Sequence, residues 1–370
     1  MFLAIRLYSS SYYWEQPYHT SKLSGHAWVQ ELIHGHPERI QNELGMRLHV
    51  FLAFVGELRA CGLKDTRYIE VEEQAAIFLY MCVLQTCFDD CFGTAVLHKI
   101  CLPPFANSPL HPFLASNPKF AAYFPGAVAA IDGTHIPCCP SAAEAEGAWD
   151  RKGGLTQNCL AACTWGLRFI YFISGWEGAT ADGTMFARAR LTDLYVAPGK
   201  YYIADAGFGI CDSLLTPYRR VRYHLKEWGR AAVRPVNAQE LFNLCHAHAR
   251  NIIERIFGIF KEQFAILSHP ANFSLQIQIR IPPGLAAIHN MIIDLDPLDL
   301  QEHLEEQEAR GGPPDPCQGE PPVFLGELAN GPVSRAEERR ASSLRDGIAQ
   351  RMWVDYQHIV QERAQLQQLQ

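Results

Sequence analysis

The chain has 370 residues, 48% of them hydrophobic, and a formal net charge of −7, so it is long enough for two domains or for one large domain with a helical appendage. The 12 cysteines are scattered, which argues against a small disulfide-stapled domain and favours reduced intracellular thiols. No apolar run reaches the roughly 18 residues of a membrane span, and we expect no cleavable signal peptide.

The charge is unevenly spread along the chain. Residues 296–370 hold 14 acids against 7 basic residues and account for the whole net charge. Residues 151–271 instead hold 15 basic residues against 9 acids. A basic middle beside an acidic tail permits a polyanionic partner without requiring one.

Helical spacing dominates the first part of the chain. Apolar residues three and four apart predict helices over about 24–35, 37–61 and 71–83. We therefore expect a small helical domain over residues 1–91 and a Pro-rich connector over residues 92–124.

A second domain is predicted over residues 125–295, with an α/β order of elements. Strands are expected at 127–136, 158–164, 168–175 and 200–204, and helices within 176–194, over 237–264 and within 281–293. Residues 210–234 are expected to form a basic loop. Residues 296–370 are expected to be an acidic, partly disordered linker that ends in a helix from about residue 335.

Three acids stand at notable places in this second domain. Asp132 closes an apolar run and precedes Gly133, Asp205 follows the fourth strand, and Glu254 lies on the polar side of the long helix. A carboxylate at the end of a buried strand is costly unless a cation lies against it. Each acid also has a structural explanation: both aspartates are compatible with tight turns, and Glu254 is compatible with a simple pair to Arg250.

Taken together, the three acids predict an oxygen-lined site for Mg²⁺ or Mn²⁺. Two such ions, about 3.5–4 Å apart, would generate the nucleophile and stabilise the leaving oxygen in phosphodiester cleavage. The neighbouring basic residues would hold DNA phosphates, while aromatic residues among them would stack on bases. The predicted DNA-binding residues are Arg219, Arg220, Arg222, Lys226, Arg230, Arg250 and Lys261.

Several motifs occur in an order that resembles the DDE-superfamily endonucleases derived from Harbinger-type transposases, in a fungal-looking variety. They include A-I-D-G-T-H-I at 130–136, R-K-G-G-L-T-Q-N at 151–158, Y-I-A-D-A-G at 202–207 and R-N-I-I-E-R-I-F-G at 250–258. The resemblance implies a ribonuclease-H-like fold, in which a mixed five-stranded sheet is flanked by helices. It also implies that Asp132, Asp205 and Glu254 are the catalytic, metal-binding triad.

The same resemblance implies DNA as the substrate, a nuclear location and a separate Myb-like DNA-binding partner. The chain departs from the family in its N-terminal helical domain, where the helix-turn-helix segment is eroded. It also has Ala181 where such proteins often place His, although Asp182 is kept. These departures leave a second hypothesis open, a catalytically inactive or domesticated transposase fragment that binds DNA or protein. Zinc-like fragments around Cys138 and His246 lack a second half at the usual spacing.

Overall fold

The computed structural model describes most of the chain and divides it into two compact units. The units are Met1–Leu79 and Tyr80–Gln370. The described residues are 23–84, 111–116, 118–141, 145–150, 152–194, 196–222, 234–270, 273–299, 302 and 333–368. None of the helices in these ranges combines the length and the apolar character needed to cross a bilayer. The finer predicted boundaries, at 91, 124 and 295, stay predictions.

The first unit is helical, as the sequence predicts. Its helices are α3 (Gly25–His34), α4 (Pro37–Leu44), α5 (Leu48–Ala60) and α6 (Val71–Leu84), the last of which runs on past the unit's end. The prediction of one continuous helix over 37–61 is wrong. Gly45 ends α4 in the left-handed region, with φ of 69°, and its N–H donates to the carbonyl of Gln41, because glycine adopts this conformation at little cost.

The second unit is built on a mixed five-stranded sheet, which confirms the predicted α/β class. Its strands are β1 (Ala127–Pro137), β2 (Thr156–Cys163), β3 (Phe169–Glu177), β4 (Tyr201–Ile203) and β5 (Leu214–Leu215). The spatial order is β3-β2-β1-β4-β5. β2 runs antiparallel to both β1 and β3, whereas β1, β4 and β5 are parallel. The sequence missed β5, since two residues are too short to show a period.

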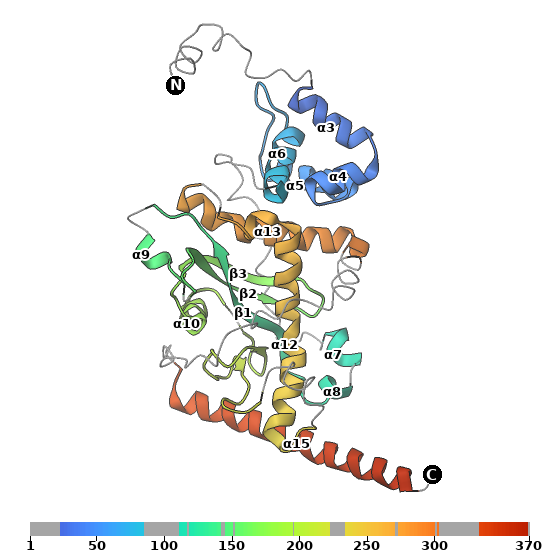
Figure 1. Cartoon of the computed structure of the whole chain (residues 1–370), viewed down its shortest axis with the longest axis vertical. Helices are drawn as coiled ribbons and strands as arrows, with labels where there is room; N and C mark the ends of the chain where they lie inside the picture. The colour runs from blue at the N-terminus through green and yellow to red at the C-terminus, as the bar shows by residue number, and fades with distance from the viewer. Residues whose placement is uncertain are drawn as a thin grey trace, which may run out of the picture. The chain divides into compact units, whose positions relative to one another are not determined.

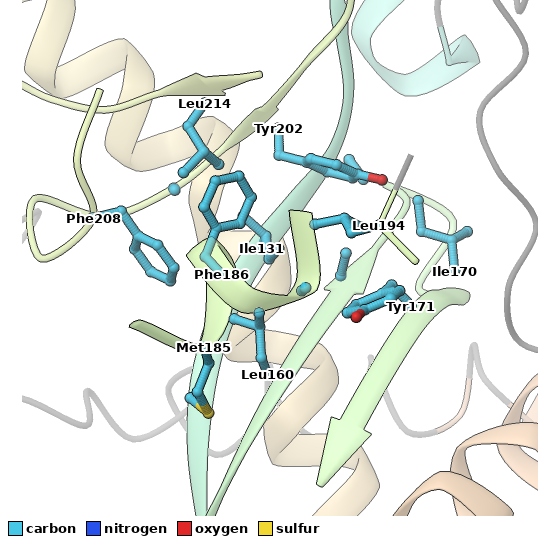
Figure 2. Packing of buried hydrophobic residues seen from close by; sticks show 14 of the residues in the cluster. Ile131, Leu160, Ile170, Tyr171, Met185, Phe186, Leu194, Tyr202, Phe208 and Leu214 are labelled. Atoms are coloured by element: carbon cyan, nitrogen blue, oxygen red, sulfur yellow. The ribbon is translucent and has the colours of Figure 1, made fainter. Parts of the chain in front are cut away.

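One face of this sheet is covered by helix α10 (Asp182–Thr192). Figure 2 shows Met185 and Phe186 of this helix among side chains of the strands, including Ile131 and Leu160. Every one of these four side chains is at most 4% exposed. This side of the sheet is therefore a dry apolar core.

The other face is covered by helix α12 (Ala238–Gln263), which lies across the strands in Figure 1. The tail helix α15 (Arg335–Gln368) packs against α12, and a second apolar cluster joins its Ile348 and Met352 to Phe242 of α12. The acidic tail thus ends in a helix that belongs to the second unit. The unit also contains three short helices, α7 (Pro112–Ser116), α8 (Pro118–Ala121) and α9 (Ala145–Ala148), and the 3-10 turn η2 (Ala265–Leu267).

Helix α13 (Leu275–Leu295) packs against β3 and starts six residues before its predicted beginning at 281. It contains Pro282 and Pro283, which lack the N–H groups that would bond the carbonyls four residues earlier. Those two carbonyls, of Gln278 and Ile279, accept instead from Gln157 of β2 at 3.0 Å and from Ser174 of β3 at 2.5 Å. Side chains of the sheet therefore stabilise a helix that the two prolines would otherwise interrupt.

Candidate active site

Asp132 lies within β1, and the strand continues past it. Pairing with antiparallel β2 runs from Ala130 to Pro137, so Asp132-Gly133 is extended backbone and the tight-turn alternative is wrong for this pair. Pairing with parallel β4 stops at Ala130, opposite Ile203. Asp132 therefore stands just beyond the carboxyl end of the parallel pair, where open α/β sheets place their ligand sites.

Asp205 follows the carboxyl end of β4 by two residues and is partly buried. One oxygen of its carboxylate accepts from the N–H of Gly207 at 2.8 Å. Arg219 fixes the same loop, because its guanidinium donates to the carbonyls of Ala206 and Phe208 at 3.0 and 3.2 Å. The turn alternative for Asp205 is thus present in the structure, and it orients the carboxylate beside β1.

Glu254 comes from the middle of α12, one helical turn after Arg250. The Arg250 guanidinium donates through Nη1 to Asp132 Oδ2 at 2.5 Å and through Nη2 to Glu254 Oε1. The pair of Glu254 with Arg250, which the sequence left as an alternative, therefore exists. It is one half of a bridge that joins β1 to α12.

The Asp132 carboxyl has a strongly shifted pKa. Burial raises the pKa of its carboxyl well above the ordinary value, the Arg250 cation opposes this shift, and the charges of Asp205, Asp182 and Glu254 raise the pKa further. Burial disfavours the charged carboxylate, and neighbouring negative charges act in the same direction. The charges of three acids from other parts of the fold therefore act on the Asp132 carboxyl.

Asp182, the fourth of these acids, was noted in the sequence but not predicted as a site residue. It begins α10, and its carboxylate lies against the backbone of Gly133, where a Cβ would come within 2.2 Å of its Oδ1. Asn158 of β2, only 1% exposed, donates from Nδ2 to the same oxygen at 2.9 Å. The signal in the sequence was Gly133 itself, because a glycine inside a strand often marks a close approach of another group.

The predicted DNA-binding residues fall into three groups in the structure. Lys226 and Arg230 lie outside the described residues. Arg219 and Arg220 are exposed, and Arg222 is half-buried. Arg250 and Lys261 instead make contacts within the unit: Lys261 donates to the carbonyl of His135 at 2.9 Å, and burial lowers its pKa. No DNA contact of these residues is tested by the geometry, and their role stays a prediction.

These acids have the oxygen ligands that a divalent cation prefers, but they are not spaced to hold one in this structure. Carboxylate oxygens are the ligands that Mg²⁺ and Mn²⁺ prefer, and a divalent cation would relieve the repulsion at Asp132. Within the described ranges, however, no group of three or more His, Cys, Asp or Glu side chains is placed to hold a metal ion. Two of the three predicted ligands are bridged by the Arg250 cation instead.

Comparison with known protein families finds two matches. Residues 20–92 match a family described as a domain of unknown function (DUF8040), so this match assigns no role to the first unit. Residues 131–290 match the family described as DDE superfamily endonuclease. Searches among curated proteins and among solved structures found no match. The second match includes Asp132, Asp205 and Glu254, and it supports a DDE-superfamily, transposase-derived endonuclease domain in this part of the chain.

Proposed function

We propose that residues 125–295 form a metal-dependent DNA endonuclease of the Harbinger transposase type, with a ribonuclease-H-like fold. One arrangement supports the proposal. Asp132 lies in β1 just past the last residue that pairs with parallel β4, Asp205 follows the end of β4, and Glu254 comes from the helix packed against these strands. The charges of Asp205 and Glu254 both act on Asp132. Acids gathered in this way around a desolvated carboxylate suit catalysis better than they suit stability.

In this proposal Asp132 and Asp205 would hold the metal from the two strand ends, and Glu254 would complete a second metal position and orient the attacking water. When bound, two Mg²⁺ or Mn²⁺ ions supply a hydroxide at neutral pH and stabilise the leaving oxygen of the phosphodiester. Strand transfer would use the same three carboxylates with a DNA 3′-hydroxyl in place of water. Asp182 would keep Asp132 oriented through its contact with Gly133.

DNA would be held by basic residues near the acids. Arg219 and Arg220 are exposed beside the Asp205 loop, and Lys226 and Arg230 continue the same basic segment in the sequence. Contacts of such residues with phosphates give affinity without sequence preference. Sequence-specific binding would therefore depend on the first unit or on a separate Myb-like partner, and the enzyme would act in the nucleus.

The proposal is tested by nicking of supercoiled plasmid in the presence of Mn²⁺ or Mg²⁺. The Asp132→Asn, Asp205→Asn and Glu254→Gln variants should each lose activity by about 100-fold or more, the scale of a lost catalytic group. Glu262→Gln, an exposed position two turns further along α12, should retain it. Equal nicking by the wild type and Asp132→Asn would remove Asp132 from the mechanism.

A second candidate function is favoured by the Arg250 bridge. Because Asp132 and Glu254 already share a cation within the protein, the same fold could serve as a metal-free module that binds DNA or protein. This candidate predicts DNA binding that is insensitive to chelators, together with no nicking by the wild type under any metal. Metal-stimulated nicking that disappears in Asp132→Asn excludes it.

A further inference from the structure

Arg250 holds an unusual position for a residue predicted to contact DNA. Its side chain is 11% exposed, and the acids it bridges, Asp132 and Glu254, are 16% and 20% exposed. The two contacts use two different nitrogens of one guanidinium. A planar guanidinium suits this bridging of two carboxylates, whereas a lysine ammonium is a single point charge.

The contact between Arg250 and Glu254 is more than a surface pair along one helix. At a spacing of four residues, an arginine that precedes a glutamate is the weaker of the two possible orders. The additional contact to Asp132 carries the guanidinium across to β1 and out of water. Removing one partner from a buried ion pair leaves an uncompensated charge, which is strongly destabilising. Arg250 therefore supplies the positive charge that these two acids require in the protein as it stands.

A divalent cation would satisfy the same two acids through the same oxygens. Arg250 Nη1 lies 2.5 Å from Asp132 Oδ2, so an ion bound to that oxygen and to Glu254 would have to take the place of the guanidinium. The positive charge of the two occupants also makes them repel each other. Binding of a metal and pairing with Arg250 are therefore alternatives at these carboxylates.

We propose that Arg250 is a positioning residue of the metal site: it keeps Asp132 and Glu254 together as an internal counter-ion, and a divalent metal must displace it. The inference rests on the proposed function, since it assumes that these acids are metal ligands. It gives Arg250 a role other than the predicted contact with a DNA phosphate. It also explains why the acids lie beside one another although no group of three in the described residues is placed to hold a metal.

The proposal makes a quantitative statement about metal affinity. A ligand's apparent affinity falls in proportion to the fraction of molecules able to bind it. If the bridged state is populated in about nine molecules out of ten, the wild type binds metal about tenfold more weakly than a variant that lacks the bridge. Removal of Arg250 should thus strengthen metal binding, whereas a residue that helps to hold the metal should weaken it when removed.

The test measures Mn²⁺ binding by calorimetry and thermal unfolding with and without Mn²⁺, on the full chain stripped of metal. Arg250→Gln should melt below the wild type without metal, gain more from Mn²⁺, and bind Mn²⁺ about tenfold more tightly. Arg250→Lys keeps the charge without the bridging geometry and should bind with intermediate affinity, so the test does not depend on the glutamine variant folding. Arg255→Gln, on the same helix, should match the wild type.

The possible results separate this inference from the proposed function. Tighter Mn²⁺ binding by both Arg250 variants supports the inference. Equal or weaker binding by both variants, with clear binding by the wild type, overturns the inference alone. If neither the wild type nor any Arg250 variant binds Mn²⁺, the proposed metal-dependent function fails, and the role of Arg250 in metal displacement fails with it.

Discussion

The two faces of strand β1 differ in what they bury. Ile131 packs in the apolar cluster under α10, where its neighbours are buried and mostly apolar side chains (Figure 2). Asp132, the next residue, points to the opposite face and meets Arg250 of α12. Successive side chains of a strand alternate between faces, so a step of one residue separates a dry core from a cluster of charges.

Strand β1 therefore contributes to the apolar core on one face and to the candidate site on the other. The apolar cluster under α10 gains its free energy from burial, and a charge within it would be costly. The α12 face keeps several acids close together, at a cost that Arg250 offsets in part. If this division holds, substitutions on the α10 face should change stability and leave chemistry intact, whereas substitutions of the acids on the α12 face should change chemistry most.

The largest stability effect is expected from Phe186→Ala on the α10 face. The Phe186 side chain is 4% exposed and packs edge-on against Phe208 with ring centroids 6.2 Å apart. Its truncation should cost about 3–5 kcal/mol of unfolding free energy, measured by urea denaturation, because the cavity can close only partly. Nicking activity per folded molecule should be unchanged. A large loss of activity in the folded fraction would contradict the separation of the two faces.

A smaller loss is expected from Gly133→Ala, where the two faces meet at Asp182. The added methyl group would lie within 2.2 Å of Asp182 Oδ1, which Asn158 holds in place. We expect a cost of about 1–3 kcal/mol from this crowding. Gly209→Ala, where a Cβ meets open space, is the matched control. In the Gly133→Ala/Asp182→Ala double variant the crowding is gone, so much of the stability lost in Gly133→Ala should be recovered. Strict additivity of the two free-energy changes would disprove the contact.

The sequence predicted α12 because its apolar pattern is long enough to show a helical period, and it predicted the first four strands from short apolar or β-rich runs. It also placed Asp205 just after β4, but it put Asp132 at a strand end, whereas β1 continues to Pro137 and only its parallel pairing with β4 stops at Ala130. The ribonuclease-H-like class and the metal-binding triad came from resemblance to a family rather than from periodicity. The roles of the three acids as ligands stay predictions.

What the sequence could not reveal depends on contacts between distant residues. The Arg250 guanidinium was expected to face DNA, but its partner Asp132 lies 118 positions earlier in the chain. The early start of α13 depends on Gln157 and Ser174 of the sheet, which satisfy carbonyls freed by Pro282 and Pro283. Helical spacing on α12 gave only the face that each residue occupies.

The stability of the metal-free protein should depend on pH through the Asp132 carboxyl. Burial raises the folded-state pKa of Asp132 above the value of about 3.9 in an unfolded chain. The folded state therefore retains a proton that the unfolded state has lost, and the contribution of Asp132 to stability falls as pH rises from the unfolded pKa through the folded one. The neutral side chain of Asp132→Asn escapes this loss.

Wild type and Asp132→Asn should thus diverge as pH rises. As pH rises from about 3.9, the unfolded value, through the raised folded-state pKa of Asp132, the variant should gain stability relative to the wild type, measured by urea unfolding with a chelator present. Asp193→Asn, on the α10 side of the sheet, where Asp193 accepts from Tyr171, serves as the comparison. A constant difference between wild type and Asp132→Asn across this range would contradict a raised pKa at Asp132.

The smallest stability effect is expected from Lys261→Gln, on the α12 face. Loss of the bond from Lys261 to the carbonyl of exposed His135 is offset by release of a desolvated ammonium, so the net change should stay below about 1 kcal/mol. Because burial lowers the pKa of Lys261, the wild type should regain stability relative to the variant as pH rises through that lowered pKa.

DNA affinity is the sharper measurement for Lys261. If Lys261 contacts a phosphate, its removal should reduce the slope of log affinity against log salt by about 0.9. Arg188→Gln, exposed on α10, should leave that slope unchanged. If Lys261→Gln and Arg188→Gln alter the slope equally, DNA contacts both faces of the sheet alike. The prediction that DNA binds on the α12 face would then be wrong.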